Sequence, residues 1–340
     1  MSTASARSGS LHLAVDAGNS KTVALLVDGG GRVLGRGRAG CGDIYGAPSP
    51  EDALTAVFRA VDDSLAAAGV RDADLSSAAF RLAGVDYPED EEYWTGHVRE
   101  RLPGLGRFSM KNDGYASLRL IDGTGVGVSI TVGTGPAIAA RSRDGREECS
   151  GMFVFDHLGG SGLGAAAMAA VCRAWMGLAP ATALTESMCR LYDVPDAWEL
   201  RHAFSRRFGA RPESDLWRAA RLVLAAADEG DEVARRIVGD HAAALVSYAR
   251  WCARRVGEDV ASGRLPVLLN GSVATSEQPA MREALTAELA RVAPAASVTT
   301  SRGSPLLGAV LDALAEGGVD VGPELLLRVR DDHPSDFLMT

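Results

Sequence analysis

Short apolar runs separated by small-residue turns open the chain, and one arrangement of them occurs twice. In the first copy, an apolar run (11–15) is followed by a polar turn (16–22), a second apolar run (23–27) and an Asp-Gly turn (28–29). The second copy has the same layout: 126–132, 133–135, 136–140 and 144–145. Apolar runs of this length bounded by Gly-bearing turns predict β-hairpins. The repetition predicts two similar lobes whose hairpin tips face one ligand.

The remaining elements alternate between strand and helix patterns. Apolar positions from 49 to 68 recur at helical spacing, behind a Ser-Pro-Glu-Asp start that is typical of a capped helix. The other predicted strands lie at 32–35, 78–83, 107–111, 266–269 and 298–300. The other predicted helices lie at 90–102, 164–177, 181–191, 195–205, 215–227, 231–256, 280–292 and 305–315. Antiparallel hairpins combined with strand–helix alternation predict an α/β fold with mixed sheets.

Length and composition limit the class of protein. The 340 residues suffice for two domains, and 46% hydrophobic with 23% charged residues is ordinary for a globular protein in water. Residues 1–10 are predicted to be a disordered tail without a secretory signal, and no apolar run reaches the roughly 20 residues of a membrane span. A net charge of −9 argues against a general nucleic-acid binder.

The cysteines and histidines show no pattern typical of a metal site. The five cysteines are odd in number and contain no Cys-x-x-Cys pair, which predicts free thiols in a reducing cytoplasm. The six histidines are scattered without metal-ligand spacing. A Gly-x-Ser-x-Gly nucleophile elbow is also absent from the sequence.

The polar turn of the first copy is the first candidate site. It reads Asp16-Ala17-Gly18-Asn19-Ser20-Lys21-Thr22. Its end resembles a P-loop, but a P-loop runs into a helix and this turn runs into a strand. The N–H and hydroxyl groups from Gly18 to Thr22 are instead predicted to hold phosphate, with Asp16 binding Mg²⁺ through water. An ordinary hairpin turn is the alternative.

Two other turns with small residues are candidate ligand contacts. Gly133-Thr134-Gly135, at the tip of the second hairpin, predicts a second phosphate contact, although such turns are frequent. Asn270-Gly271-Ser272 follows a buried strand, and its small side chains let a flat ligand such as an adenine ring lie against the backbone. A plain strand-to-helix connection is the alternative for this last turn.

Several aspartates follow strands or lie in glycine-rich loops. Asp113, in Asn112-Asp113-Gly114, comes just past a strand, where a carboxylate can take a proton from an attacking hydroxyl group. Asp86 follows another strand and the turn residue Gly84. A structural role in a turn is the alternative for both aspartates.

The loop 40–46 and the segment around residue 156 complete the candidates. Asp43 and Tyr45 suit sugar recognition, because carboxylates accept hydroxyl hydrogen bonds and aromatic rings cover a sugar; a plain connector is the alternative. Asp156 and His157 precede a glycine-rich helix start, whose N–H groups attract anions and polar ligand atoms. For His157 a structural role is favoured over catalysis.

In this order, the motifs resemble those of the actin-like ATPase and sugar kinase superfamily. Within it, the chain is most similar to the group that contains N-acetylglucosamine kinase and the BadF/BadG/BcrA/BcrD ATPases. The turns at 16–22, 133–135 and 269–274 look like its first phosphate, second phosphate and adenosine motifs. Segments 82–86 and 112–113 match those carrying substrate contacts and the catalytic aspartate, here Asp113.

The resemblance implies two actin-like, ribonuclease H-like lobes around a central ATP cleft. It implies a first lobe at 11–112 and a helix-rich second lobe at 113–303. A terminal helix at 304–318 would pack back on the first lobe, followed by a loose tail at 319–340. The implied activity is ATP- and Mg²⁺-dependent phosphorylation of an amino sugar such as N-acetylglucosamine or glucosamine at the 6-hydroxyl. The implied sugar contacts are Asp43, Tyr45, Gly84, Asp86, Asn112 and Asp156. A cytoplasmic homodimer is the corresponding expectation.

Departures from the family pattern lie mostly around the expected sugar pocket. The stretch 157–161 lacks two acidic residues, Asp43 stands where asparagine is usual, and Gly151-Met152-Phe153 replaces Gly-Trp-Gly. Pro136 stands where serine is common. Two other functions therefore remain open, an ATPase coupled to a partner protein and a sugar- or nucleotide-sensing protein without turnover. The scattered cysteines do not support a shared iron–sulfur cluster.

Overall fold

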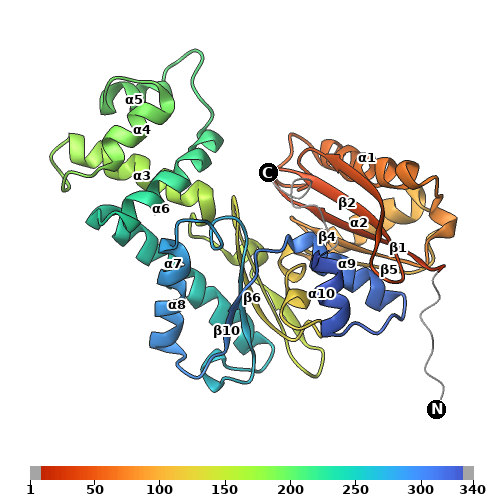
Figure 1. Cartoon of the computed structure of the whole chain (residues 1–340). Helices are drawn as coiled ribbons and strands as arrows, with labels where there is room; N and C mark the ends of the chain where they lie inside the picture. The colour runs from red at the N-terminus through yellow and green to blue at the C-terminus, as the bar shows by residue number, and fades with distance from the viewer. Residues whose placement is uncertain (1–8, 332–340) are drawn as a thin grey trace.

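Two mixed sheets of five strands form the centre of the computed structural model, which describes residues 9–331 (Figure 1). The first sheet has the order β3-β2-β1-β4-β5, with β1 Leu11–Ala17, β2 Thr22–Asp28, β3 Val33–Ala39, β4 Ser77–Leu82 and β5 Phe108–Asn112. The second has the order β8-β7-β6-β9-β10, with β6 Gly127–Val132, β7 Pro136–Arg141, β8 Glu147–Cys149, β9 Val267–Asn270 and β10 Val298–Thr300.

Both sheets have the same topology. In each, the first three strands are antiparallel neighbours, and the last two run parallel to the first strand and to each other. The hairpin repeat in the sequence therefore extends to the whole sheet, and the predicted two-lobed α/β fold is confirmed.

Alternating strand residues bury the two faces of the first sheet under different helices. Leu13 and Val15 pack with α1 (Pro50–Ala68) and α2 (Pro88–Arg101), whereas Ala14 and the β2 residues Val23 and Leu25 pack with α9 (Pro305–Glu316). Successive strand side chains point to opposite faces, so this sheet needs a helix layer on each side. Figure 1 shows α9, in blue, lying against this lobe.

Helices dominate the second lobe. α3 (Gly159–Trp175), α6 (Ala220–Asp228), α7 (Glu232–Arg255) and α8 (Ala280–Val292) share one apolar core with the second sheet. α4 (Leu184–Tyr192) and α5 (Ala197–Ala203) lie at the outer end of this lobe (Figure 1). Within residues 9–331 no helix has both the length and the apolar character needed to cross a membrane.

The structure corrects several predicted elements. α3 begins at Gly159, five residues before the predicted start. Its first turn is rich in glycine, a residue that does not indicate a helix in the sequence. β8 was not predicted; it has three residues, two of them glutamates. The predicted helix 215–227 is a 3-10 segment, Glu213–Ala219, followed by α6.

The predicted tails are only partly described. The prediction of a loose tail at 319–340 is wrong for residues 323–331, which form the helix α10 (Pro323–Asp331). Its Leu325 and Val329 are buried beside α9. Residues 332–340 lie outside the described part of the chain. The predicted disordered tail 1–10 also lies outside it, apart from residues 9 and 10.

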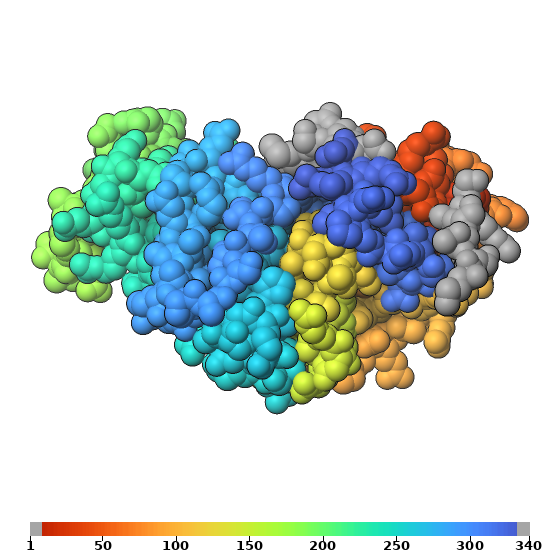
Figure 2. All heavy atoms as spheres, turned by 60° about the horizontal axis from the view of Figure 1, so that its bottom comes forward, coloured from red at the N-terminus to blue at the C-terminus, as the bar shows by residue number. Residues whose placement is uncertain are grey.

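Two segments connect the lobes. Residues 113–126 lead from β5 to β6 through two short 3-10 helices, and residues 301–304 lead from β10 back to α9. Figure 2 shows the yellow stretch that contains the first connection lying between the orange first lobe and the cyan part of the second.

Candidate active site between the lobes

The tips of the two repeated hairpins meet. The Ser20 Oγ of the first tip lies 3.0 Å from the Thr134 Oγ1 of the second, within hydrogen-bonding distance. Inside the tips, the Gly18 N–H donates to the Lys21 carbonyl at 2.9 Å, and the Gly133 N–H donates to the Gly135 carbonyl at 3.0 Å. The structure therefore brings together two turns that are more than a hundred residues apart in the chain.

The start of α3 holds the second tip in place. The N–H groups of Gly160 and Ser161 donate to the carbonyls of Gly133 and Thr134 at 2.8 and 3.0 Å. Gly159 has a φ of +76°, and a Cβ there would lie 2.7 Å from the Thr134 oxygen, so only glycine fits this approach. The amides of Gly160 and Ser161 therefore hold the tip, and the Gly133 amide is bonded within it, so these three N–H groups are already paired in this structure.

The loop 40–46 supports the first tip. The Gly42 N–H donates to the Gly18 carbonyl at 3.1 Å, and a Cβ on Gly46 would lie 1.7 Å from Asn19 Oδ1. Thr22 is fully buried, and its hydroxyl donates to the Gly40 carbonyl at 3.0 Å. The Thr22 hydroxyl thus fastens the supporting loop to the tip, and a phosphate contact at Thr22 stays a prediction.

Predicted carboxylates gather beside the tips because β1, β4 and β5 are parallel neighbours. Asp16 lies near the end of β1, Asp86 follows β4, and Asp113 directly follows β5. Burial raises the pKa of Asp113 to about 8, and the negative charges of Asp16, Asp86 and Asp43 add to that rise. Four carboxylates from three strand ends and one loop thus influence each other electrostatically.

Asp86 lies where the two lobes touch. The side-chain Nδ2 of Asn112 donates to Asp86 Oδ1 at 2.9 Å, while its side-chain Oδ1 accepts from the Gly114 N–H at 2.8 Å. Burial, together with the charges of Asp90 and Asp43, raises the pKa of Asp86 to about 6 against the opposing effect of that amide.

A second-lobe glycine closes this contact. A Cβ on Gly151 would lie 2.3 Å from the same Asp86 oxygen, so a second-lobe backbone segment packs directly on this carboxylate. The predicted pair Asp86 and Asn112 is therefore assembled within the interface between the lobes.

The sugar-recognition loop packs on the turn after β4. Asp43 Oδ1 accepts from the Tyr45 N–H at 2.9 Å, and a Cβ on Gly84, whose φ is +79°, would lie 2.6 Å from that oxygen. The Tyr45 hydroxyl donates to Asp90 Oδ1 at 2.8 Å, while the residue as a whole remains 54% exposed. This exposure leaves room for a ligand.

Asp90 is a site residue that the motifs did not indicate. Its Oδ2 accepts from the N–H groups of Asp86 and Tyr87 at 3.0 and 2.8 Å, so it orders the loop that carries Asp86. The available signal was its place as the third residue of a helix that begins with proline, where a carboxylate reaches back to free N–H groups.

Asp16 suits a magnesium ion held through water. Burial raises its pKa to about 6, and the charge of Lys21 only partly opposes that rise. A partly exposed carboxylate oxygen among other negative charges matches the ligand preference of Mg²⁺, which usually keeps several waters. In the described part of the chain no group of three or more His, Cys, Asp or Glu side chains could hold a metal ion directly.

The Asn270 side chain lies where the two connections between the lobes meet. It is fully buried, and its amide donates to the carbonyls of Ser301 and Gly303 at 2.7 and 2.9 Å. Its oxygen lies 3.3 Å from the Ser117 hydroxyl. This side chain joins the two connections between the lobes, and the adenosine contacts of Asn270, Gly271 and Ser272 stay predictions.

Asp156, another predicted sugar contact, is bound by a helix of the second lobe. It is exposed, and its Oδ2 accepts from the Tyr248 hydroxyl of α7 at 2.6 Å. The carboxylates with the largest influence on Asp113 are Asp16, Asp86 and Asp43. Asp156 is therefore oriented by α7.

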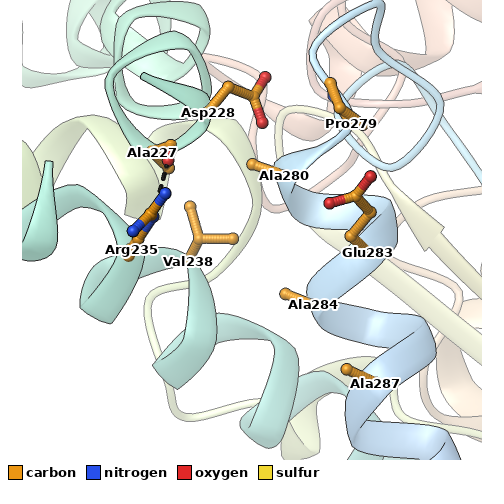
Figure 3. Close-up of a pocket in the computed structure, with 9 residues that line it drawn as sticks. All are labelled: Ala227, Asp228, Arg235, Val238, Pro279, Ala280, Glu283, Ala284 and Ala287. Atoms are coloured by element: carbon orange, nitrogen blue, oxygen red, sulfur yellow. Dashed lines mark hydrogen bonds between the residues drawn. The ribbon is translucent and has the colours of Figure 1, made fainter. Parts of the chain in front are cut away.

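A groove between α6, α7 and α8 was not predicted from the sequence (Figure 3). Its lining combines small apolar side chains with three charged ones: Ala227, Asp228, Arg235, Val238, Pro279, Ala280, Glu283, Ala284 and Ala287. The Arg235 Nε donates to the Ala227 carbonyl at 3.1 Å, and Asp228 and Glu283 extend from α6 and α8 on either side of the groove.

The groove is connected to the second tip by α6. The first residue of this helix, Ala220, has its Cβ 3.7 Å from where a Cβ on Gly160 would lie, next to the tip. Its last residue, Asp228, lies about 12 Å further along at 1.5 Å per residue. The far side of the groove begins where the loop after Asn270 enters α8.

Comparisons with known proteins agree with this arrangement. The family model for the BadF/BadG/BcrA/BcrD ATPase family matches residues 13–313. N-acetyl-D-glucosamine kinase of Dictyostelium discoideum is 23% identical over 318 residues, which cover 89% of this chain and 98% of the relative.

Solved structures share the fold. A candidate N-acetylglucosamine kinase from Chromobacterium violaceum matches with a TM-score of 0.67 and 21% identity, over 89% of this chain and 99% of its own. A ROK family glucokinase from Streptomyces griseus, solved with glucose and AMPPNP, matches with a TM-score of 0.56 and 17% identity, over 91% and 98%.

Proposed function

Because the chain belongs to the BadF/BadG/BcrA/BcrD ATPase family, we propose that it is an ATP-dependent kinase that phosphorylates the 6-hydroxyl of an amino sugar such as N-acetylglucosamine or glucosamine. The observation that carries the proposal is the place of Asp113 directly after β5, near Asp16 at the first of two facing hairpin tips. The activity named for the Dictyostelium relative supports the choice of sugar.

Asp113 is the proposed general base. Its raised pKa makes it a stronger proton acceptor than an ordinary carboxylate, which suits the removal of a proton from a hydroxyl group. The sugar oxygen forms a bond to the γ-phosphorus, its proton passes to Asp113, and the bond to the bridging oxygen of ADP breaks. Asp86 and Asp43 orient the sugar through hydroxyl hydrogen bonds. Positioning and charge neutralisation supply most of the rate enhancement in such a transfer.

The tips are the proposed phosphate contacts. N–H groups of the two turns other than those of Gly18 and Gly133, which are bonded within the turns, would donate to phosphate oxygens, and the Ser20 and Thr134 hydroxyls, now 3.0 Å apart, would turn from each other to the phosphate. Asp16 orders the water shell of Mg²⁺, which when bound neutralises charge on the phosphates.

The groove in Figure 3 is the proposed adenine site. Its small side chains present a flat apolar surface, and its distance of about 12 Å along α6 from the second tip suits an extended nucleotide with its phosphates at the tips. The loop that begins with Gly271 and Ser272 would then pass the ribose on its way to α8.

Filling the groove should weaken ATP binding selectively. Ala284→Trp places a large ring in the groove, so the KM for ATP is expected to rise about tenfold or more, while the KM for sugar stays within about twofold. Initial rates at varied ATP and fixed saturating sugar measure this effect. Thr286→Trp, on the exposed side of α8, is the matched control. Equal ATP constants in both variants would exclude the groove as the adenine site.

The kinase activity is tested by ATP turnover with Mg²⁺ against a panel of sugars. The panel contains glucosamine, N-acetylglucosamine, N-acetylmannosamine, N-acetylmuramic acid and glucose. Turnover that requires one amino sugar supports the proposal if NMR of the product locates the phosphate on the 6-hydroxyl. ATP hydrolysis that ignores every sugar would favour the partner-coupled ATPase, and ligand binding without turnover would favour the sensor. The homodimer and the cytoplasmic location stay predictions.

A further inference from the structure

A continuous chain of ion pairs links the strand that carries Asp113 to the second lobe. Lys111, on β5 of the first lobe, pairs with Glu147 on β8 of the second. The other Glu147 oxygen accepts from Arg141 Nε, at the end of β7, at 2.5 Å. Arg141 Nη1 in turn lies 4.0 Å from Asp312 Oδ1 on α9, which packs on the first lobe. The chain thus crosses the boundary between the lobes twice.

Asp312 is the centre of this chain. Its carboxylate is almost fully buried and accepts from Arg81 on β4 at 2.7 Å and from Arg119, in the first connection between the lobes, also at 2.7 Å. Arg81 is equally buried and also donates to the Phe80 carbonyl at 2.9 Å. These groups are desolvated and held by several partners, so the centre resists rearrangement.

Lys111, the first residue of this chain of ion pairs, lies next to the proposed general base. Lys111 precedes Asp113 by two residues, and its ammonium lies 5.5 Å from the centre of the Tyr115 ring, on the other side of Asp113 in the sequence. Arg141 is the last residue of β7, which begins directly after the tip 133–135, so Arg141 is separated from the tip by the length of this strand, about 17 Å at 3.3 Å per residue. The ion pairs therefore connect Asp113, through the turn after Lys111, with the strand that carries the second tip.

We propose that Lys111 and Glu147 are positioning residues, which hold Asp113 in register with the second phosphate-binding tip through the chain Lys111–Glu147–Arg141–Asp312. The inference rests on the proposed function, because it assigns the geometry to sugar phosphorylation. A base displaced by about 1 Å from its reacting hydroxyl can cost about a hundredfold in rate, so a link of this kind affects kcat more than ligand affinity.

The test is a double-mutant cycle on kcat for sugar phosphorylation. Lys111→Met, which keeps the apolar stem near Tyr115, and Glu147→Gln are each expected to lower kcat about tenfold or more, with the KM for ATP within about twofold. The double variant is expected to be no slower than the slower single variant. The conservative variant Lys111→Arg, which keeps the positive charge, is expected to have a kcat within about threefold of the wild-type value.

The neighbouring ion pair provides the control. Glu148, the next residue on β8, accepts from Arg255 Nε at 3.0 Å, and both residues belong to the second lobe. Glu148→Gln and Arg255→Met are expected to leave kcat within about twofold of wild type. Thermal unfolding of every variant separates loss of coupling from loss of fold. Wild-type kcat in a folded Lys111→Met protein, or effects that multiply in the double variant, would overturn the proposal.

A readout without turnover separates this inference from the kinase proposal. If the wild-type protein phosphorylates no sugar, the proposed function fails, and small-angle X-ray scattering still tests the link between the lobes. The Lys111→Met/Glu147→Gln protein is then expected to have a larger radius of gyration than wild type, while the Glu148→Gln/Arg255→Met protein matches wild type. Equal radii in all three proteins would overturn the inference.

Discussion

Asp113→Asn is expected to lower kcat for sugar phosphorylation by a factor of about 10² to 10⁴, the usual contribution of a general base. The amide has nearly the shape of the carboxylate but cannot accept the proton of the attacking hydroxyl. Removing one negative charge from the group formed with Asp16, Asp86 and Asp43 does not remove a phosphate contact. Nucleotide affinity, measured by calorimetric titration, is therefore expected to stay within about threefold of wild type.

The control for this variant is Asp320→Asn, which makes the same chemical change at an exposed position outside the helices. It is expected to have wild-type kcat. The decisive comparison is the rate of ADP release at saturating ATP and sugar in the two variants. If Asp113→Asn turns over sugar as fast as Asp320→Asn, Asp113 is not the base.

Asp312→Asn is expected to reduce the free energy of unfolding by about 3 to 5 kcal/mol, the typical cost of removing one partner from a buried ion pair. The amide leaves the buried Arg81 and the neighbouring Arg119 without their negative partner. Urea unfolding followed by circular dichroism measures the change, and Asp320→Asn again serves as the control. A loss below about 1 kcal/mol would mean that the arginines find other partners.

The same variant has a predictable pH dependence. Burial opposes the charge of Asp312, but Arg81, Arg141 and Arg119 outweigh it and lower the pKa of this carboxyl in the folded protein. A group with a lowered folded pKa stabilises the protein fully above its unfolded pKa of about 4, and this contribution disappears as the pH falls through the folded value. The stability difference between wild type and Asp312→Asn is therefore expected to be constant near neutral pH and to shrink below pH of about 4.

The sequence predicts those parts of the site that depend on local pattern. The hairpin tips follow from apolar runs and glycine turns, and Asp113 follows from its place after a strand. Their meeting was predicted from the repeat alone, because two similar units imply two similar tips. The contact between Ser20 and Thr134 confirms that the tips face each other.

The contacts that the sequence could not predict involve side chains whose partners are distant in sequence. Thr22 and Asn270 stand in ligand motifs, yet they are buried against Gly40 in one case and against Ser301 and Gly303 in the other. Small polar residues suit a phosphate turn and a buried hydrogen bond equally, so only the fold distinguishes them. α10 was missed for a similar reason, since its two apolar contacts are weak signals without α9 beside them.

The return of α9 to the first sheet has a consequence for biosynthesis. A ribosome delivers the first five strands early, but the sheet face formed by Ala14, Val23 and Leu25 remains uncovered until residues 305–316 have emerged. Domains made of one continuous stretch can complete folding as they leave the ribosome. Here the second lobe is translated in full before the first can close its core, so the lobe that begins first is completed last, and a nascent chain that stalls before residue 305 carries an apolar surface for chaperones to bind.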